Sequence, residues 1–240
     1  MGLLRRLVRL RRVARVLVLR EAEDGTRTAE ALRARGHEPL LLPLQTACLL
    51  DPPPGGGPVG GFIATSAHAA PWLARHAAGM PVLAVGARTA EALRGAGLGR
   101  VVEGPGRARD LVPMAAALGS KAGAPLVYAA GRLRLPDLET GLRARAVPFR
   151  TIEVYGMDDR VPDEAEIDRA LAGGLPDAAL ILSRRQAELF EALAARRAAL
   201  LHPALRPLCL SAAVAARLRP GRRGEWGERP TLDRLLALLD

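Results

Sequence analysis

VLAVGARTAEALRGAG, residues 82–97, contains the parts of a βα unit in direct succession. Val82–Val85 is a short apolar run with β-branched residues at both ends, and Gly86 interrupts it. Helix-forming residues fill 89–94 before two closely spaced glycines end the pattern. The stretch therefore predicts a strand, a tight turn and a helix.

The turn at Gly86 matches no common nucleotide motif. Neither the dinucleotide fingerprint G-x-G-x-x-G nor the phosphate loop G-x-x-x-x-G-K-[ST] follows it, and Lys121 is the single lysine of the chain. Free backbone N–H groups at a helix start nevertheless attract anions of any kind. The turn therefore predicts an anion site rather than a nucleotide site.

The same succession of elements recurs along the chain. Six stretches place a short apolar run before a turn and a helix: VLVLREAEDGTRTAEALRARGH, FIATSAHAAPWLARHA, VLAVGARTAEALRGAG, LVYAAGRLRLPDLETGLRARAV, LILSRRQAELFEALAARR and LCLSAAVAARLRP. Strands that alternate with helices indicate parallel pairing and an α/β fold.

Two strand-like stretches interrupt this alternation, LLLPLQTACLL at 40–50 and PFRTIEVYGMD at 148–158. Each leads into a turn-rich segment instead of a helix. They predict two doubly wound, parallel-sheet α/β domains joined by a pair of strands. The expected boundaries are 59–147 for the middle domain, 16–39 with 162–240 for the domain built from both chain ends, 40–58 with 148–161 for the linker strands, and 1–15 for a basic N-terminal extension.

Ligands of open parallel sheets bind beyond the carboxyl ends of the strands. Two such sheets facing each other would form a cleft lined by turn residues, namely Thr65, Ser66, Gly86, Thr89, Gly131, Arg132, Ser183 and Ser211. The alternative is that the serines and threonines only cap helices. Small residues at all six turns favour a backbone that is open to a ligand.

Composition excludes several classes of protein. The chain has 240 residues, of which 49% are hydrophobic and 25% charged, and its apolar runs are much shorter than the roughly 20 residues that span a bilayer. Cys48 and Cys209 are far apart in sequence, and no C-x-x-C motif is present. We therefore expect a cytoplasmic protein without stable membrane association.

The net charge of +10 is concentrated at one end of the chain, because six arginines and no acidic residue lie in 1–15. An aromatic content of 3% also argues against base stacking, so we expect no nucleic-acid partner. Leucines and valines of this segment form an approximate helical stripe opposite the arginines. The segment is either an unstructured appendage or a helix that lies on anionic membranes.

The order and spacing of several pieces resemble the uroporphyrinogen-III synthase family over Val16–Leu239. The pieces are VLVLREAEDGTRTAEALRARGHEPLLLPL, IATSAHAA, LAVGARTAEALRGAGL, LVYAAGRLRLPDLETGLRARAV, the VY of EVYGMD, ALILSRRQAELF and PTLDRLLALL. The resemblance implies two α/β domains joined by a two-stranded ladder. It also implies a monomeric hydro-lyase of porphyrin biosynthesis that needs no cofactor or metal.

Enzymes of this family close linear hydroxymethylbilane into uroporphyrinogen III, with inversion of the last pyrrole ring and loss of water. The resemblance therefore implies that hydroxymethylbilane is the substrate and that the preceding enzyme of the pathway is a candidate partner. The substrate carries many carboxylates, which backbone N–H groups at helix starts can hold with help from arginine. Ala67 joins the expected substrate contacts through the matching piece IATSAHAA.

Tyr155 stands at the VY position of the family, which nominates it as the proton donor for hydroxyl loss. A phenol keeps its proton at neutral pH and can donate it. Thr89 matches a threonine that lines the cleft of the family. The alternative for Tyr155 is a strand tyrosine whose hydroxyl only stabilises the ladder.

One stretch departs from the family. The last domain reads LSAAVAARL, with Ser211 in place of a glycine and alanine and valine in place of polar residues. A carboxylate contact is lost there, or the Ser211 hydroxyl makes it. Two further functions stay open: a two-domain protein that binds a tetrapyrrole or another small polyanion without turnover, and a nucleic-acid or membrane-surface protein that acts through 1–15.

Overall fold

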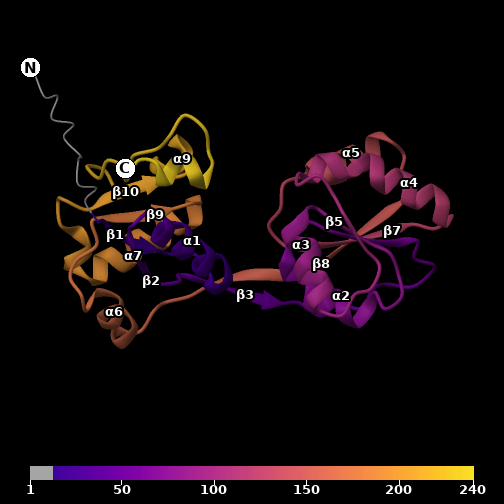
Figure 1. Ribbon diagram of the computed structural model, residues 1–240, viewed down its shortest axis with the longest axis horizontal. Coiled ribbons are helices and arrows are strands. Elements are labelled where there is room, and N and C mark those ends of the chain that lie inside the picture. The colour runs from indigo at the N-terminus through magenta and orange to yellow at the C-terminus, as the bar shows by residue number, and fades with distance from the viewer. Residues whose placement is uncertain (1–12) are drawn as a thin grey trace, which may run out of the picture. The chain divides into compact units, whose positions relative to one another are not determined.

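The computed structural model of the protein describes residues 13–240, so residues 1–12 of the expected N-terminal extension lie outside the described part. The chain forms two compact units. Unit 1 combines the chain up to Thr46 with Asp159–Asp240, and unit 2 is the continuous segment Ala47–Asp158. Figure 1 shows this chain path: indigo and yellow elements belong to unit 1, and magenta elements belong to unit 2.

A six-stranded sheet with the order β3-β8-β7-β4-β5-β6 organises unit 2. Its strands are β3 (Gln45–Leu49), β4 (Gly61–Ala64), β5 (Val82–Ala84), β6 (Val101–Glu103), β7 (Leu126–Gly131) and β8 (Phe149–Asp159). Its helices are η1 (Ala67–Ala69), α2 (Ala70–His76), α3 (Ala87–Gly95), η2 (Ala108–Leu111), α4 (Val112–Ala122) and α5 (Asp137–Ala144). The strands from β8 to β6 are parallel to one another, which confirms the α/β class.

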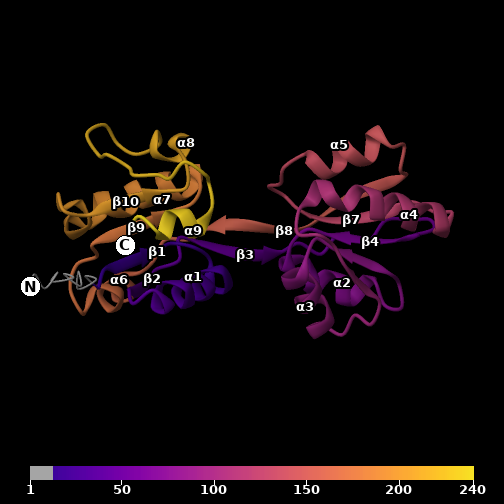
Figure 2. The same cartoon turned by 45° about the horizontal axis from the view of Figure 1, so that its top comes forward.

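Helices cover both faces of this sheet, as Figure 2 shows. Trp72 of α2 and Leu93 of α3 pack with Phe62 on one face. Leu138 of α5 and Ile63 belong to the cluster on the other face. Because side chains of a strand alternate between faces, a central parallel strand must be apolar on both, and all four residues of β4 are buried.

Unit 1 is built around a four-stranded sheet with the order β10-β9-β1-β2, and every pair in it is parallel. Its strands are β1 (Arg15–Val18), β2 (Glu38–Leu41), β9 (Ala178–Ile181) and β10 (Arg206–Cys209). Its helices are α1 (Ala22–Ala34), α6 (Glu164–Leu171), α7 (Arg184–Arg196), η3 (Ala198–Leu201), α8 (Ala212–Ala215) and α9 (Leu232–Leu236). β2 includes residues 40 and 41, which the sequence pattern assigned to a linker.

The sheet of unit 1 also has a hydrophobic cluster on each of its two faces. Val16 and Val18 face Leu32 of α1 and the leucines of α9, whereas Leu17 faces Phe190 of α7 on the opposite side. Of these side chains, only Leu232 of α9 is partly exposed, and the others are buried. Burial of one such side chain stabilises the fold by about 1.5–3 kcal/mol.

The chain crosses between the units within β3 and at the end of β8. The backbone N–H of Leu50 donates to Val154, and that of Arg160 donates to Leu44. The residue number increases along the first segment, from 44 to 50, while it decreases along the second, from 160 to 154. β3 and β8 are therefore antiparallel, unlike the other strand pairs of the sheet.

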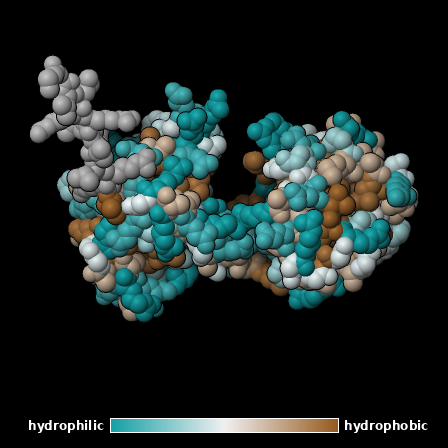
Figure 3. Space-filling model, in the orientation of Figure 1, coloured by the Kyte–Doolittle hydropathy of each residue, from teal (hydrophilic) through white to brown (hydrophobic). Residues whose placement is uncertain are grey.

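The surface is mostly hydrophilic, with scattered hydrophobic patches on both units, as Figure 3 shows for one face. Leu133 and Leu135 are the most exposed large hydrophobic side chains among the described residues, at 78% and 76%. Both lie in the loop after β7. Within residues 13–240, no helix is long and apolar enough to cross a membrane.

Candidate functional site

The strand order places a topological switch point in each sheet. In unit 2 the chain moves outward from β4 through β5 to β6, then returns to the other side of β4 for β7 and β8. In unit 1 the corresponding switch lies between β1 and β9. Crevices at such points, beyond the carboxyl ends of the strands, are the usual ligand sites of open α/β sheets.

Thr65 and Tyr128 join the two strands that flank the switch point of unit 2. Thr65 directly follows β4, Tyr128 lies in β7, and their hydroxyl oxygens are 2.8 Å apart. Tyr128 is 2% exposed. Burial raises the pKa of its phenol, and the hydrogen bond with Thr65 opposes that rise only in part. Tyr128 is therefore a neutral structural partner of the Thr65 turn.

Tyr155 lies at the same edge of the sheet, and a bulge in β8 decides which face of the sheet carries it. Ala130 of β7 pairs with Glu153, but Gly131 pairs with Tyr155, so Val154 is an extra residue. Without the bulge, Tyr155 would share the face of Glu153. With it, Tyr155 packs on the same side as Val154, against the cluster that contains Trp72.

Gly131 makes room for the ring of Tyr155. A β-carbon at position 131 would lie 2.6 Å from Cζ and 2.7 Å from the hydroxyl oxygen of Tyr155. The backbone carbonyl of Tyr155 also accepts a hydrogen bond of 2.9 Å from the N–H of Arg132. The phenol therefore lies directly over the carboxyl end of β7.

Arginine side chains of the loop after β7 serve two purposes. Arg134 donates to the carbonyl of Gly131, to Glu139 and to Glu153, each at 3.0 Å, which fixes the loop. Partial burial alone would raise the pKa of Glu139, but hydrogen bonds from Thr151 and Arg134 outweigh it and lower that pKa. Arg132 lies 3.8 Å from Glu153, and 58% of its side chain is exposed. It is the more available of the two cations.

The turn at Gly86 is tight for a packing reason. A β-carbon at Gly86 would lie 3.0 Å from the α-carbon of Gly106, whose N–H donates to Val85. Gly86 is the N-cap of α3 and offers no side chain to its first N–H groups, which leaves them to other acceptors. Thr89, in the first turn of α3, is only 5% exposed, so it contributes little open surface.

The serines at the other turns divide into capping and non-capping residues. Ser66 accepts from the N–H of His68, and Ser183 accepts from the N–H of Gln186. Both serve as helix caps, as the alternative interpretation of the sequence expected. Ser211 precedes α8 and, within the described residues, its side chain caps no N–H group.

The structure brings the predicted site residues together in two groups. At the carboxyl edge of unit 2 lie the turns with Thr65, Ser66 and Ala67, with Gly86 and Thr89, and with Gly131, Arg132 and Tyr155. At the carboxyl edge of unit 1 lie Ser183 and Ser211, after the neighbouring strands β9 and β10. Ala67 is 6% exposed and supplies backbone rather than side-chain surface.

Two residues at these edges escaped the sequence interpretation. The ring of His68 lies 5.4 Å from that of Tyr155, centroid to centroid. Arg20 follows β1 at the switch point of unit 1, where it bonds Thr28 at 3.2 Å and pairs with Asp24. The position of Arg20 directly after an apolar strand was a usable signal. The contact of His68 with Tyr155 depends on the bulge in β8, and no sequence pattern indicates it.

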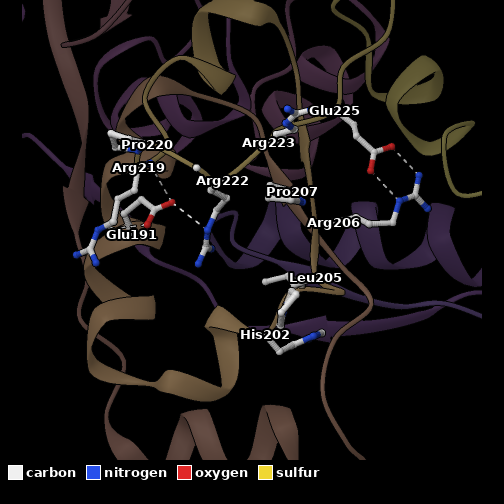
Figure 4. Close-up of a pocket in the computed structure, with 12 residues that line it drawn as sticks. Glu191, His202, Leu205, Arg206, Pro207, Arg219, Pro220, Arg222, Arg223 and Glu225 are labelled. Carbon is white, nitrogen blue, oxygen red and sulfur yellow. Dashed lines mark hydrogen bonds and ion pairs between the residues drawn. The ribbon is translucent and has the colours of Figure 1, made fainter.

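A cavity of about 550 Å³ lies elsewhere in unit 1, along β10 (Figure 4). Arg206 holds Glu225 through two hydrogen bonds of 2.8 Å, and Arg222 lies 3.4 Å from Glu191. Figure 4 shows these guanidinium groups directed at their glutamates rather than at a common point. None of the predicted site residues lines this cavity, and we assign it no ligand.

The fold and the sequence each relate this chain to known proteins. The two sheets place the chain among the open, parallel α/β proteins whose ligands bind beyond the carboxyl ends of the strands. Its sequence matches the family described as "Uroporphyrinogen-III synthase HemD" over residues 26–236. The chain therefore belongs to the uroporphyrinogen-III synthase family, whose members are hydro-lyases of porphyrin biosynthesis.

Solved structures of this family resemble the chain. Uroporphyrinogen-III synthetase from Helicobacter pylori is 16% identical, with a TM-score of 0.59 over 95% of this chain and 98% of that one. A mutant and the wild-type enzyme from Thermus thermophilus are 21% and 23% identical, with TM-scores of 0.42 and 0.37. The matches cover 96% and 97% of those two chains and 95% of this chain. The Helicobacter structure supports the fold. A search of the curated proteins gave no match.

Proposed function

We propose that this protein closes linear hydroxymethylbilane to uroporphyrinogen III, with inversion of the last pyrrole ring and release of one water. The family match over residues 26–236 carries the proposal. The position of Tyr155 supports it, because this residue pairs with Gly131 at the carboxyl end of β7, which flanks the switch point, and its ring packs against Gly131. A proton donor is needed where a ligand can bind, and Tyr155 fits that requirement.

The reaction begins with loss of the substrate's hydroxyl group. The phenol of Tyr155 donates its proton to the hydroxyl oxygen, the carbon–oxygen bond breaks, and water leaves. The adjacent pyrrole supplies the electron pair that stabilises the resulting cation. The last ring first bonds this cation through the carbon that already carries its methylene bridge. The bond from that carbon to the bridge then breaks, and the bridge re-forms at the free α-carbon of the same ring, which inverts the ring. That α-carbon gives up one proton, which restores the phenol. The protein mainly fixes the geometry of this closure.

Binding in this proposal depends on the acetate and propionate groups of the substrate. The N–H groups that follow Gly86 at the start of α3 hold carboxylates, and the exposed guanidinium of Arg132 pairs with another. Thr65, Ser66, Ala67 and Gly131 shape the edge around them. Thr89, which is almost fully buried in the first turn of α3, helps to position that turn against the substrate.

Unit 1 supplies further contacts of the same kind in our proposal. Ser211 is the stronger candidate, because its side chain is not used as a cap within the described residues. The hydroxyl of Ser183 already accepts a bond from Gln186, but it can still donate one to a carboxylate. The LSAAVAARL departure from the family is therefore compatible with a serine contact.

The proposal includes a cytoplasmic monomer that receives substrate from the preceding enzyme of the pathway. It requires no cofactor, no nucleic acid and no stable membrane association. Both cysteines are free thiols, which suits a reducing compartment. Sedimentation of the purified protein alone, and with that preceding enzyme, tests the monomer and the partner separately.

Product analysis tests the central proposal. Freshly prepared hydroxymethylbilane is added to the full-length protein, and the products are oxidised and separated by chromatography. We expect mainly isomer III, whereas spontaneous closure gives isomer I. Isomer I alone, at the rate seen without protein, would refute the proposal. Tight binding of the substrate without turnover would instead favour the non-catalytic binding protein.

A further inference from the structure

His68 contacts the proposed proton donor from a fixed position. Its ring lies 5.4 Å from the ring of Tyr155, at an interplanar angle of 52°. His68 belongs to η1, whose other residues, Ala67 and Ala69, are buried at 6% and 0% exposure. The cap by Ser66 fixes the start of this helix, because the N–H of His68 donates to the Ser66 hydroxyl at 3.3 Å. The backbone from which the imidazole extends is therefore fixed.

Tyr155 needs such a contact because its position depends on an irregular strand. The bulge at Val154 removes one regular pairing from β8 just before the tyrosine. Gly131 bounds the ring on the side of β7, where a β-carbon would already be too close. A tyrosine side chain can occupy several staggered rotamers, and neighbouring atoms help to decide which of them is populated. His68 is the neighbouring ring that η1 provides.

We infer that His68 is a positioning residue, which holds the phenol of Tyr155 between its imidazole ring and the α-carbon of Gly131 and thereby directs the hydroxyl toward the substrate. The inference rests on the proposed role of Tyr155 as proton donor. It assigns His68 to packing rather than to binding of the substrate. A ring is the required property, so phenylalanine should replace histidine, and alanine should not.

Kinetics with hydroxymethylbilane provide the first test. Displacement of a reacting group by about 1 Å costs up to 10²-fold in rate, so we expect about a tenfold fall in kcat for His68→Ala. KM should stay within about twofold, because loss of a substrate contact would raise it instead. His68→Phe should recover most of kcat. His76→Ala is the matched control, since His76 also lies against an aromatic ring, 4.5 Å from Trp72, in the same unit.

Fluorine NMR provides a second test that does not need activity. The chain has two tyrosines, so 3-fluorotyrosine gives two resonances, and Tyr128→Phe assigns them. We expect the Tyr155 resonance to move in His68→Ala and to return close to its original position in His68→Phe. His68→Asn, which also removes the ring, replaces the alanine variant if that variant does not fold.

The outcomes separate this inference from the proposed function. If the parent protein forms no isomer III, the proposed function fails, and fluorine NMR still decides whether His68 holds Tyr155. An unchanged Tyr155 resonance in both His68→Ala and His68→Asn would overturn the inference. A raised KM with unchanged kcat would overturn it as well, because His68 would then contact the substrate.

Discussion

The hydroxyl groups of Tyr128 and Thr65 lie 2.8 Å apart and connect β7 to the turn after β4 across the switch point of unit 2. This bond ties a buried core side chain to one of the proposed substrate turns. The state of Tyr128 therefore influences both the stability of the unit and the shape of its carboxyl edge.

Tyr128 should make the protein sensitive to alkali. Burial raises the pKa of Tyr128 in the folded state above the ordinary value of 10.0. Its stabilising contribution is complete below pH 10, where both folded and unfolded chains carry the proton, and is lost as the pH rises through the folded pKa. The free energy of unfolding, measured in urea from about pH 8 to about pH 11, should fall less steeply in Tyr128→Phe. An identical pH dependence for parent and variant would contradict this expectation.

At neutral pH, Tyr128→Phe should cost about 0.5–1.5 kcal/mol, the usual net value of a neutral hydrogen bond. Urea unfolding of parent and variant at neutral pH measures this difference.

Gly131→Ala should disturb catalysis without unfolding the protein. The added β-carbon would lie 2.6 Å from the ring of Tyr155, so the ring must move. We expect a fall of about 10²-fold in the rate of isomer III formation, since the donor is displaced by the order of 1 Å. Gly119→Ala in α4 is the matched control. Its β-carbon would meet neighbours at ordinary distances of 3.6–3.8 Å, and alanine favours a helix by about 0.5–1 kcal/mol.

Tyr155→Phe retains the ring and its packing but removes the proposed proton donor. Loss of a general acid usually costs about 10²-fold or more. We expect a smaller loss, because the pyrrole assists departure of the hydroxyl and water can replace the phenol in part. Thr89→Ala should weaken binding by about 0.5–1.5 kcal/mol or less. Both rates should be compared after the melting temperatures are matched to the parent. Full activity of Tyr155→Phe would make Tyr155 a structural residue.

Arg134→Gln should destabilise unit 2 more than Arg143→Gln does. Both arginines face Glu139, but Arg134 is 24% exposed and bonds it at 3.0 Å, whereas Arg143 is 66% exposed and lies 3.7 Å away. We expect a loss of about 1–3 kcal/mol for the first variant and within about 0.5 kcal/mol for the second. Urea unfolding at neutral pH measures both.

The same variant predicts a change in acid stability. The lowered pKa of Glu139 contributes stability above pH 4.5 that is lost as the pH falls through the folded pKa. Arg134→Gln should therefore flatten the acid limb of the stability curve. A parallel shift of the whole curve would show that the guanidinium does not hold this carboxylate in the charged form.

Cys209 should resist alkylation in the native state. Burial raises the pKa of its thiol to about 12. In a Cys48→Ala background at about pH 8, its reaction with iodoacetamide should be slower than in urea by on the order of 10³-fold, the ratio of the two thiolate fractions. Equal rates would place Cys209 at the surface.

The elements predicted best from the sequence are those that local pattern alone dictates. The apolar run before Gly86 becomes β5, and the helix formers after it become α3, because periodicity and glycine placement need no distant partner. The recurrence of this unit also predicts the parallel pairing correctly, since a strand followed by a crossover helix returns parallel.

The details of the candidate site depend on distant contacts. The bulge that re-aims Tyr155 arises from the register of β8 on β7, which no pattern within VYGMD reveals. The role of Ser183 as a cap could not be separated from a ligand contact, because both use a small polar residue at a helix start. The need for glycine at position 86 comes from Gly106, a neighbour from the next loop.

The discontinuous build of unit 1 has a consequence for the order of folding. Arg15 and Asp177, which join β1 to the segment before β9, are 162 residues apart in sequence, so the sheet of unit 1 cannot close until most of the chain has been synthesised. Unit 2 is continuous and can form on the ribosome before that point. When unit 2 is complete, Leu50 is bonded to Val154. The chain that must close to bring β9 beside β1 then consists of two short segments instead of the whole inserted segment, which lowers the entropy cost of closure. Unit 2 can thus fold before unit 1, and truncation within β8 would leave β1 paired with β2 alone, without its second neighbour β9.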